Sequence, residues 1–159
     1  MIIPEHSEAS SALKSALNIL GYADNTEKKL REKLYARGYS KSAVNDAVAY
    51  LKEHRYLDDR RFLERAVEHY AKVKLYGRAR IRRELFAKGF SREDIDGIDY
   101  GEFDIDFVGL CGTRINKTAS RYKSRDALTA ALARYGYMYS EIKSALEHSD
   151  QKEQEYEQN

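Results

Sequence analysis

A ten-residue pattern that occurs three times constrains this chain more than any other feature of its sequence. Each copy has an apolar residue, a leucine four positions later, a glycine four positions after that, and then an aromatic residue. The copies are Leu30–Tyr39, Ile81–Phe90 and Leu128–Tyr137, and their glycines are 51 and 47 residues apart. Chance explains one such match but not three. Repetition at this spacing predicts a tandem array of helical units.

The glycine in each copy is expected to end a helix. Apolar residues four apart lie on one face of a helix, and a glycine after them is the usual residue at a left-handed C-cap. We therefore assign structural roles to Gly38, Gly89 and Gly136 and predict a positive φ angle at each. Ser40 and Ser91 stand where the N-cap of a following helix is expected. Stacking of such units explains the apolar positions without any binding site.

The composition fits a soluble, helix-rich chain without a membrane span. Of 159 residues, 34% are charged, and there is one proline and no tryptophan, so little interrupts a helix. Residues 1–11 have neither the basic nor the apolar segment of a secretory signal, so a cytoplasmic location is expected. Cys111 is the only cysteine, which rules out an internal disulfide and a thiolate zinc cluster.

Four helices are predicted in the first half of the chain. Residues 12–22 form an apolar helix, and a second helix ends at Gly38. A third helix places the apolar residues of 44–51 on one face. The fourth runs from residue 60 to about residue 73 and separates an apolar stripe from a basic face.

Charge is segregated along the chain although the net charge is only +2. Residues 60–92 contain eleven Lys or Arg and three Glu, whereas residues 93–106 contain seven acids and no base. Residues 112–125 contain five bases and no acid, and residues 147–159 are acidic. Any one such block is often only a solvated face, but their alternation indicates an electrostatic partner.

Basic side chains on the predicted helix surfaces are the candidate contacts for that partner. Guanidinium groups bind phosphates or carboxylates through paired hydrogen bonds, and neighbouring tyrosines suit either DNA or an acidic protein. The sequence does not choose between these partners. The candidate partner-binding residues are Arg61, Arg65, Lys72, Arg80, Arg82, Arg83, Arg121 and Lys123.

Signals of catalysis or metal binding are weak. The histidines lack the spacing of metal ligands, and no glycine-rich phosphate loop is present. Asp58 and Asp59 could form an acid pair, but adjacent carboxylates before a helix more often cap it, and we assign them that structural role. The run Asp94–Asp99 lacks the ligands of a calcium loop. We expect no enzymatic activity, no cofactor and no metal.

Three motifs in the middle of the chain carry a family resemblance. They are Tyr56–Phe62, which reads Tyr-Leu-Asp-Asp-Arg-Arg-Phe, then Gly77-x-x-x-Ile81, and then Glu84–Phe90. These residues resemble the RecX family, whose members regulate the bacterial recombinase RecA. The likeness covers roughly residues 12 to 146 and is most specific from Leu51 to Ile95.

The resemblance implies an all-α fold, an elongated array of three tandem, helix-turn-helix-like three-helix repeats. It implies a regulator, mainly an inhibitor, that lies in the groove of the RecA filament on DNA. Such a protein modulates the ATPase, strand-exchange and co-protease activities of RecA in recombination and the SOS response. Its basic faces are expected to contact RecA, DNA or both, and it is expected to act as a monomer without catalysis.

The chain departs from the family pattern at three places. Arg55 stands where the family commonly has Gly, and Arg78 replaces a common Pro. Residues 97–112 contain four glycines where the second repeat needs its last helix, so a loop or a short, irregular helix is expected there.

The repeats predict five segments. They are a flexible N-terminus (1–11), a first repeat with its preceding helix (12–73), a second repeat (74–117), a third repeat (118–150) and an acidic tail (151–159). Two other functions fit the same residues: a stand-alone helix-turn-helix-like DNA-binding protein, and a structural helical-repeat adaptor. Loss of binding at high salt is expected of a DNA-binding protein, whereas a filament regulator needs RecA for its effect.

Overall fold

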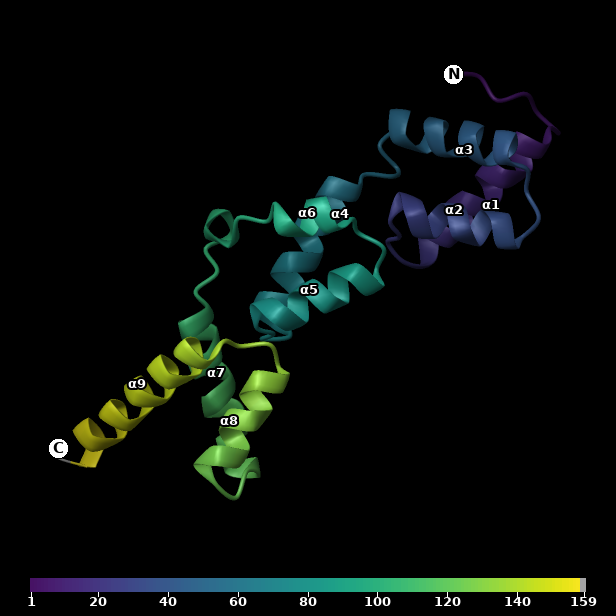
Figure 1. The fold of residues 1–159 in the computed structure, drawn as a ribbon. Coiled ribbons are helices and arrows are strands. Elements are labelled where there is room, and N and C mark those ends of the chain that lie inside the picture. The colour runs from purple at the N-terminus through teal and green to yellow at the C-terminus, as the bar shows by residue number, and fades with distance from the viewer. Residues whose placement is uncertain (158–159) are drawn as a thin grey trace. The chain divides into compact units, whose positions relative to one another are not determined.

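Every regular element in the computed structural model, which describes residues 1–157, is helical. Residues 1–157 contain nine α-helices, a π-helical turn and two 3-10 turns, and no strand (Figure 1). The all-α prediction is therefore confirmed. Within the same residues, no helix combines the length and the apolar composition needed to cross a bilayer.

The chain divides into two compact units, and each unit joins segments that are distant in sequence. The first unit consists of Met1–Arg65 and Phe86–Arg92, and the second of Ala66–Leu85 and the chain from Glu93 onward. The division points lie inside α4 (Asp59–Glu68), inside α5 (Arg78–Ala87) and at the start of α6 (Arg92–Asp96). Neither unit is a continuous stretch of sequence.

Three helices form the body of the first unit, namely α1 (Glu8–Tyr22), α2 (Glu27–Ala36) and α3 (Lys41–Glu53). Each begins at a hydroxyl cap, which satisfies a backbone N–H that has no partner inside the helix. The caps are Ser7 for α1, Thr26 for α2 and Ser40 for α3, with oxygen-to-nitrogen distances of 3.1, 3.2 and 3.2 Å. The sequence predicted the cap at Ser40.

Two groups of buried apolar side chains hold these helices together. The larger group draws on all three helices and on the segment after α3, and it comprises Ala16, Ile19, Leu30, Leu34, Val44, Val48, Leu51 and Leu57. The smaller group is made of alanines, Ala9 and Ala12 of α1 with Ala43 and Ala47 of α3. Because Ser7 caps α1 and Ala9 is buried, α1 begins at Glu8, earlier than the expected residue 12.

The three glycines of the repeated pattern have the predicted positive φ angles. The values are +88° at Gly38, +92° at Gly89 and +97° at Gly136. In each turn the glycine N–H donates to the carbonyl three residues earlier, at 2.9, 3.0 and 3.0 Å. An L side chain is strained in this conformation, so the sequence uses glycine where the helix must end.

In both units a glycine turn contacts the start of a helix from the preceding copy of the pattern. In the first unit the hydroxyl of Thr26, directly before α2, donates to the carbonyl of Lys88 at 2.9 Å. In the second unit the N–H of Gly77, directly before α5, donates to the carbonyl of Tyr135 at 2.8 Å. A Cβ on Gly77 would lie 2.2 Å from the carbonyl carbon of Gly136. Copies of the pattern are therefore joined at equivalent positions, through the Thr26 hydroxyl in the first unit and through the backbone of Gly77 in the second.

The second unit begins inside the predicted fourth helix. Residues 59–68 form α4, and His69–Val73 continue it as a π-helical turn, so the predicted span of 60–73 is helical. The elements that follow α5 and α6 are η2 (Tyr100–Phe103), α7 (Phe107–Thr118), η3 (Ala119–Arg121), α8 (Arg125–Arg134) and α9 (Tyr139–Glu157).

The glycine-rich segment 97–112 is irregular in its first part and a regular helix in its second part. Its first part contains the short 3-10 helix η2, but from Phe107 it belongs to α7. Asp106 caps α7 by accepting from the N–H of Val108 at 3.1 Å, and Phe107 and Cys111 are buried on one face. The expected loop with a short, irregular helix is therefore present at residues 97–106, whereas from Phe107 onward burial of an apolar face outweighs the low helix propensity of the glycines and the expectation is wrong.

The acidic C-terminal segment is also helical, because α9 extends to Glu157. Residues 158 and 159 of the predicted acidic tail lie outside the described residues. The division of the chain into segments at residues 11, 73, 117 and 150 remains a prediction.

Candidate partner-binding surfaces

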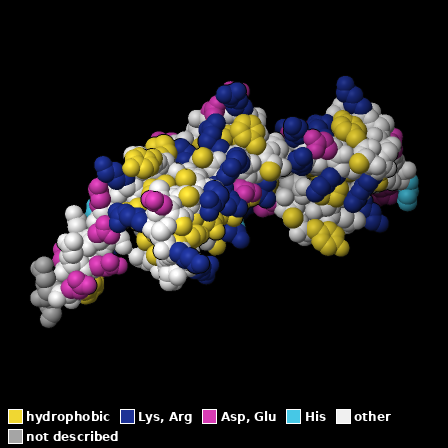
Figure 2. All heavy atoms as spheres, turned by 60° about the horizontal axis from the view of Figure 1, so that its bottom comes forward, with side chains coloured by type: hydrophobic (Ala, Val, Ile, Leu, Met, Phe, Trp, Pro, Cys, Tyr) yellow, Lys and Arg dark blue, Asp and Glu magenta, His cyan; other side chains and the backbone are white. Residues whose placement is uncertain are grey.

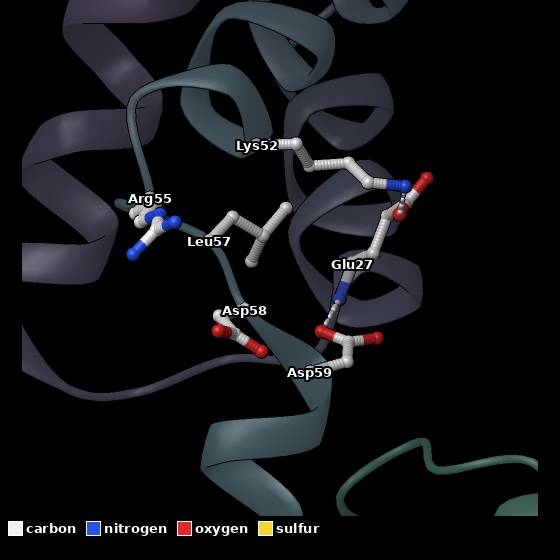
Figure 3. A pocket seen from close by; sticks show the side chains of 6 residues that line it. All are labelled: Glu27, Lys52, Arg55, Leu57, Asp58 and Asp59. Carbon is white, nitrogen blue, oxygen red and sulfur yellow. Dashed lines mark hydrogen bonds and ion pairs between the residues drawn. The ribbon is translucent and has the colours of Figure 1, made fainter.

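The adjacent carboxylates Asp58 and Asp59 both act at helix starts in the first unit. Asp58 Oδ1 accepts from the backbone N–H of Arg61 at 3.0 Å, the hydrogen bond of an N-cap on α4. Asp59 Oδ1 accepts from the backbone N–H of Glu27 at 2.9 Å, so it satisfies the first turn of α2 (Figure 3). The sequence predicted capping of α4, but not that Asp59 reaches a second helix.

A polar pocket of about 690 Å³ lies beside these caps and is lined by Glu27, Lys52, Arg55, Leu57, Asp58 and Asp59. Lys52 Nζ lies 2.9 Å from Glu27 Oε2, and Arg31 Nε lies 3.0 Å from Glu27 Oε1. Figure 3 shows the Lys52–Glu27 pair on one side of Leu57 and Arg55 on the other.

The Glu27 carboxylate of this pocket does not suit acid catalysis at neutral pH. Partial burial raises the pKa of Glu27, but hydrogen bonds from Lys52 and Arg31 and their positive charges together lower it below its ordinary value. Glu27 is therefore ionised at neutral pH and cannot serve as a general acid there. Within residues 1–157, no group of three His, Cys, Asp or Glu side chains is placed to hold a metal ion.

A second pocket of about 210 Å³ in the first unit contains two of the predicted partner-binding residues. Arg65 lies in this pocket and forms an ion pair with Asp24, with 2.9 Å between Nη2 and Oδ2. Arg61 lines the same pocket, and its exposed guanidinium has no partner among residues 1–157. The complete lining is Leu20, Asp24, Asn25, Arg55, Tyr56, Leu57, Asp58, Arg61, Phe62 and Arg65.

Four of the predicted basic residues in the second unit already have partners within that unit. Lys72 pairs with Glu68 at 3.5 Å, and Arg82 pairs with Asp96. Arg80 pairs with Glu84 at 3.5 Å and places its Cζ 4.1 Å from the ring centre of Tyr76. Arg83 donates to the carbonyl of Arg134 at the end of α8, at 3.3 Å. These four side chains therefore already have contacts within the unit, whatever else they bind.

The remaining two predicted residues, Arg121 and Lys123, are exposed between α7 and α8. Neither side chain has a partner among residues 1–157. Figure 2 shows one face of the molecule, on which Lys and Arg side chains are spread among apolar ones and acidic side chains gather near the C-terminal end. Together with Arg61 in the first unit, Arg121 and Lys123 are the candidates whose charge is unpaired.

Arg114 is a buried basic residue whose role the sequence did not reveal. Its side chain lies on the buried face of α7, with only 9% of the residue exposed. Its Nε donates to the carbonyl of Leu75 at 2.9 Å and its Nη2 to that of Lys74 at 2.5 Å. Its Cζ lies 3.5 Å from the ring centre of Tyr135. Arg114 therefore joins three segments of the second unit: the end of the π-helical turn, α7 and the glycine turn after α8.

Two ionisable groups beside Arg114 are held in their neutral forms. Burial raises the pKa of the Cys111 thiol to about 12, and burial also raises the pKa of Tyr137. The Tyr137 hydroxyl donates to the carbonyl of Leu75 at 2.7 Å. Cys111 is thus a protonated core residue rather than a nucleophile at neutral pH.

Two family models match the chain in order. The model "RecX, first three-helix domain" matches residues 12–51, and "RecX, second three-helix domain" matches residues 58–97. Among curated proteins, the chain is 34% identical over 129 residues to "Regulatory protein RecX" of Clostridium botulinum (strain Alaska E43 / Type E3), covering 76% of this chain and 60% of that protein. The protein of the same name from Escherichia coli (strain SE11) is 36% identical over 115 residues, covering 66% of this chain and 68% of the relative.

Solved structures show the same fold. "Crystal structure of RecX from Lactobacillus salivarius" superposes with a TM-score of 0.78 at 21% identity and covers 90% of this chain and 97% of that chain. A second, "Crystal structure of regulatory protein RecX", superposes with a TM-score of 0.74 at 20% identity and covers 88% and 73% of the two chains. The chain spans about 60% of the length of the Clostridium relative.

Proposed function

The chain belongs to the RecX family of regulatory proteins, and from this premise we propose that it regulates the recombinase RecA by binding the RecA filament on DNA. The match of two consecutive RecX domain models to residues 12–51 and 58–97 carries the proposal. The proposed effect is mainly inhibition of the ATPase, strand-exchange and co-protease activities of RecA. The chain acts in this scheme as a cytoplasmic monomer, by binding rather than by catalysis.

The paired and unpaired cations support a refined proposal for the contact surface. An arginine that already forms a hydrogen-bonded ion pair has less to gain from a new partner than one in open solvent. We place Arg61, Arg121 and Lys123 first among the contacts, because their charges have no partner in residues 1–157. Arg65, Lys72 and Arg83 are exposed but engaged, and Arg80 and Arg82 are half-buried, so all five rank below.

The direct test measures RecA ATPase activity and strand exchange with substoichiometric amounts of this chain. Inhibition that requires RecA on single-stranded DNA is the expected result. A chain without effect on either activity at stoichiometric concentration would contradict the proposal. Steep loss of DNA binding with salt and no effect on RecA would instead indicate a stand-alone DNA-binding protein.

Charge reversal tests the contact surface separately. Replacing Arg61, Arg121 and Lys123 by Glu should leave folding unchanged, since all three are exposed and unpaired, but should weaken inhibition about tenfold or more. The matched control replaces Lys14, Lys28 and Lys41, three exposed lysines, by Glu. Equal inhibition by both triple variants would exclude these cations as the contact.

A further inference from the structure

Met138 lies where the other two copies of the repeated pattern have a serine. The residue two positions after the glycine is Ser40 in the first copy and Ser91 in the second, and Ser40 caps α3. In the third copy Met138 directly precedes α9, and its carbonyl accepts from the N–H of Ile142 at 3.0 Å. A thioether is a poor helix cap, so the sequence departs from its own pattern at this position. Such departures are expected at functional side chains.

Glu141 holds the backbone of Met138, and Arg78 contacts its sulfur. Glu141 Oε2 accepts from the N–H of Met138 at 2.7 Å, and Glu141 Oε1 lies 3.4 Å from Nη1 of Arg78. The same Nη1 lies 3.7 Å from Sδ of Met138. The guanidinium carbon of Arg78 also lies 4.6 Å from the ring centre of Phe107. The thioether therefore has beside it a hydrogen-bond donor that other contacts hold in place.

The sulfur of Met138 is accessible to small molecules in solution. Met138 is 49% exposed, whereas Cys111, which lies in the same unit, is fully buried. Met1 is the other methionine of the chain and is 54% exposed. It pairs with Glu53 through its terminal amine, and its sulfur has no donor among the described residues. The chain thus contains two thioethers of similar exposure, one with a guanidinium donor and one without.

We propose that Met138 is a site of reversible oxidation by hydrogen peroxide and that Arg78 assists the reaction. The sulfur lone pair attacks one peroxide oxygen, so the sulfur–oxygen bond forms and the oxygen–oxygen bond breaks. The departing hydroxide takes the proton of the transferred oxygen and leaves as water, and the sulfur loses the two electrons that the peroxide gains. A guanidinium N–H that donates to the departing oxygen stabilises the negative charge that develops on it. Methionine sulfoxide reductases restore the thioether.

Oxidation changes the hydrogen bonding of Arg78. A sulfoxide oxygen is a stronger acceptor than a thioether sulfur, and it forms on the atom that lies 3.7 Å from Nη1 of Arg78. It therefore competes for Arg78 with Glu141, whose carboxylate is buried. Because Arg78 is the first residue of α5 and Glu141 lies in the first turn of α9, oxidation weakens the contact between the starts of these two helices. The reaction is independent of the proposed action on RecA.

The test follows oxidation of the intact chain by hydrogen peroxide with peptide mass spectrometry, and Met1 is the internal reference. In the folded chain Met138 should be oxidised about threefold or more faster than Met1, the effect of part of one charge-assisted hydrogen bond. In urea that unfolds the chain, the two methionines should react at about the same rate. Arg78→Gln and Arg78→Lys should both lower the folded ratio toward the unfolded one, because neither side chain has the planar fork of arginine.

Matched variants separate this site from general charge and from folding. Arg134→Gln removes the same charge from an exposed position of the second unit and should keep the parent ratio of rates. Peroxide should lower the melting temperature of the parent by about 2–4 °C, and reductase treatment should restore it. Met138→Leu should show neither change, and Cys111 should remain a thiol.

Three results would overturn the proposal. The first is a folded chain in which Met138 is oxidised no faster than Met1. The second is a parent rate at Met138 in Arg78→Gln or Arg78→Lys, in whichever of the two keeps the circular dichroism of the parent. The third is a parent melting temperature in a chain that mass spectrometry shows to be fully oxidised at Met138.

Discussion

Replacement of Arg114 by Met should destabilise the second unit more than any surface change in it. The substitution keeps most of the apolar stem but removes the two hydrogen bonds to Leu75 O and Lys74 O and the contact with Tyr135. Hydrogen bonds from a charged donor contribute about 1.5–3 kcal/mol each, and a desolvated cation–π contact contributes about 2 kcal/mol. The cost of burying the guanidinium, which the variant no longer has, opposes these contributions by several kcal/mol.

The net change in the free energy of unfolding depends on whether the two carbonyls that Arg114 leaves still have donors. Leu75 O still accepts from the Tyr137 hydroxyl at 2.7 Å, so only Lys74 O loses its side-chain donor. An unsatisfied, partly buried carbonyl costs about 1–3 kcal/mol. We therefore expect Arg114→Met to lower the free energy of unfolding by about 2–4 kcal/mol. Arg114→Lys should recover little, because an ammonium group lacks the planar fork that reaches both carbonyls and stacks on the ring.

Urea denaturation followed by tyrosine fluorescence and far-ultraviolet circular dichroism measures this change, and amide hydrogen exchange locates it. Faster exchange should be confined to the second unit, in α7, α8 and the turn at Leu75. Arg121→Met, the same substitution at an exposed position, serves as the control and should change stability by less than about 0.5 kcal/mol. If Arg114→Met unfolds at the same urea concentration as Arg121→Met, the buried arginine does not join the segments as argued.

Three other outcomes follow from the geometry. In Gly38→Ala the added Cβ has no atom within 4 Å, so the variant should lose about 1 kcal/mol of stability from its positive φ alone. Gly136→Ala should lose more, because its Cβ would lie 2.4 Å from the N of Arg80. Equal melting temperatures for the two variants would contradict this order. Leu34→Ala and Leu85→Ala remove fully buried side chains and should each cost about 2–5 kcal/mol in urea denaturation, and losses below about 1 kcal/mol would refute their equivalence in the repeat. The folded-state pKa of Glu27 lies below its ordinary value of 4.5, so its contribution to the free energy of unfolding is present above pH 4.5 and is lost as pH falls through the folded-state value. Glu27→Gln should therefore make the free energy of unfolding fall less steeply on the acid side. An unchanged pH profile would argue against the ion pairs with Lys52 and Arg31.

The helices and their glycine turns were predictable because they depend on local sequence. Apolar residues at helical spacing and a glycine that permits a positive φ require no knowledge of distant residues, and Gly38, Gly89 and Gly136 behave as expected. Contacts between distant segments were not predictable in the same way. Nothing near Asp59 in the sequence indicates that it reaches the start of α2, and Gly77 gives no sign that it meets the Gly136 turn.

The charged blocks show why the candidate site was harder to predict than the fold. A basic residue in a sequence is equally compatible with an ion pair, a buried hydrogen-bond donor and a partner contact. Arg82 pairs with Asp96, and Arg125 pairs with Asp150, so part of the alternation between basic and acidic blocks serves pairing within the second unit. One signal in the sequence points to burial of Arg114: it lies on the apolar face formed by Phe107, Cys111 and Ile115.

The interleaved composition of the two units has a consequence for synthesis on the ribosome. The first unit contains Met1–Arg65 but also Phe86–Arg92, and Phe90 of the second segment contacts Phe62 of the first, with ring centres 5.1 Å apart. The N-terminal segment of the first unit therefore emerges first, but it lacks its partner segment, Phe86–Arg92, until residue 92 has left the exit tunnel. By then all of α5 has also been made, so the apolar surface that Phe90 covers on the first segment stays open during this part of elongation. A nascent chain stalled before residue 86 should be digested by protease more readily than one stalled well beyond residue 92.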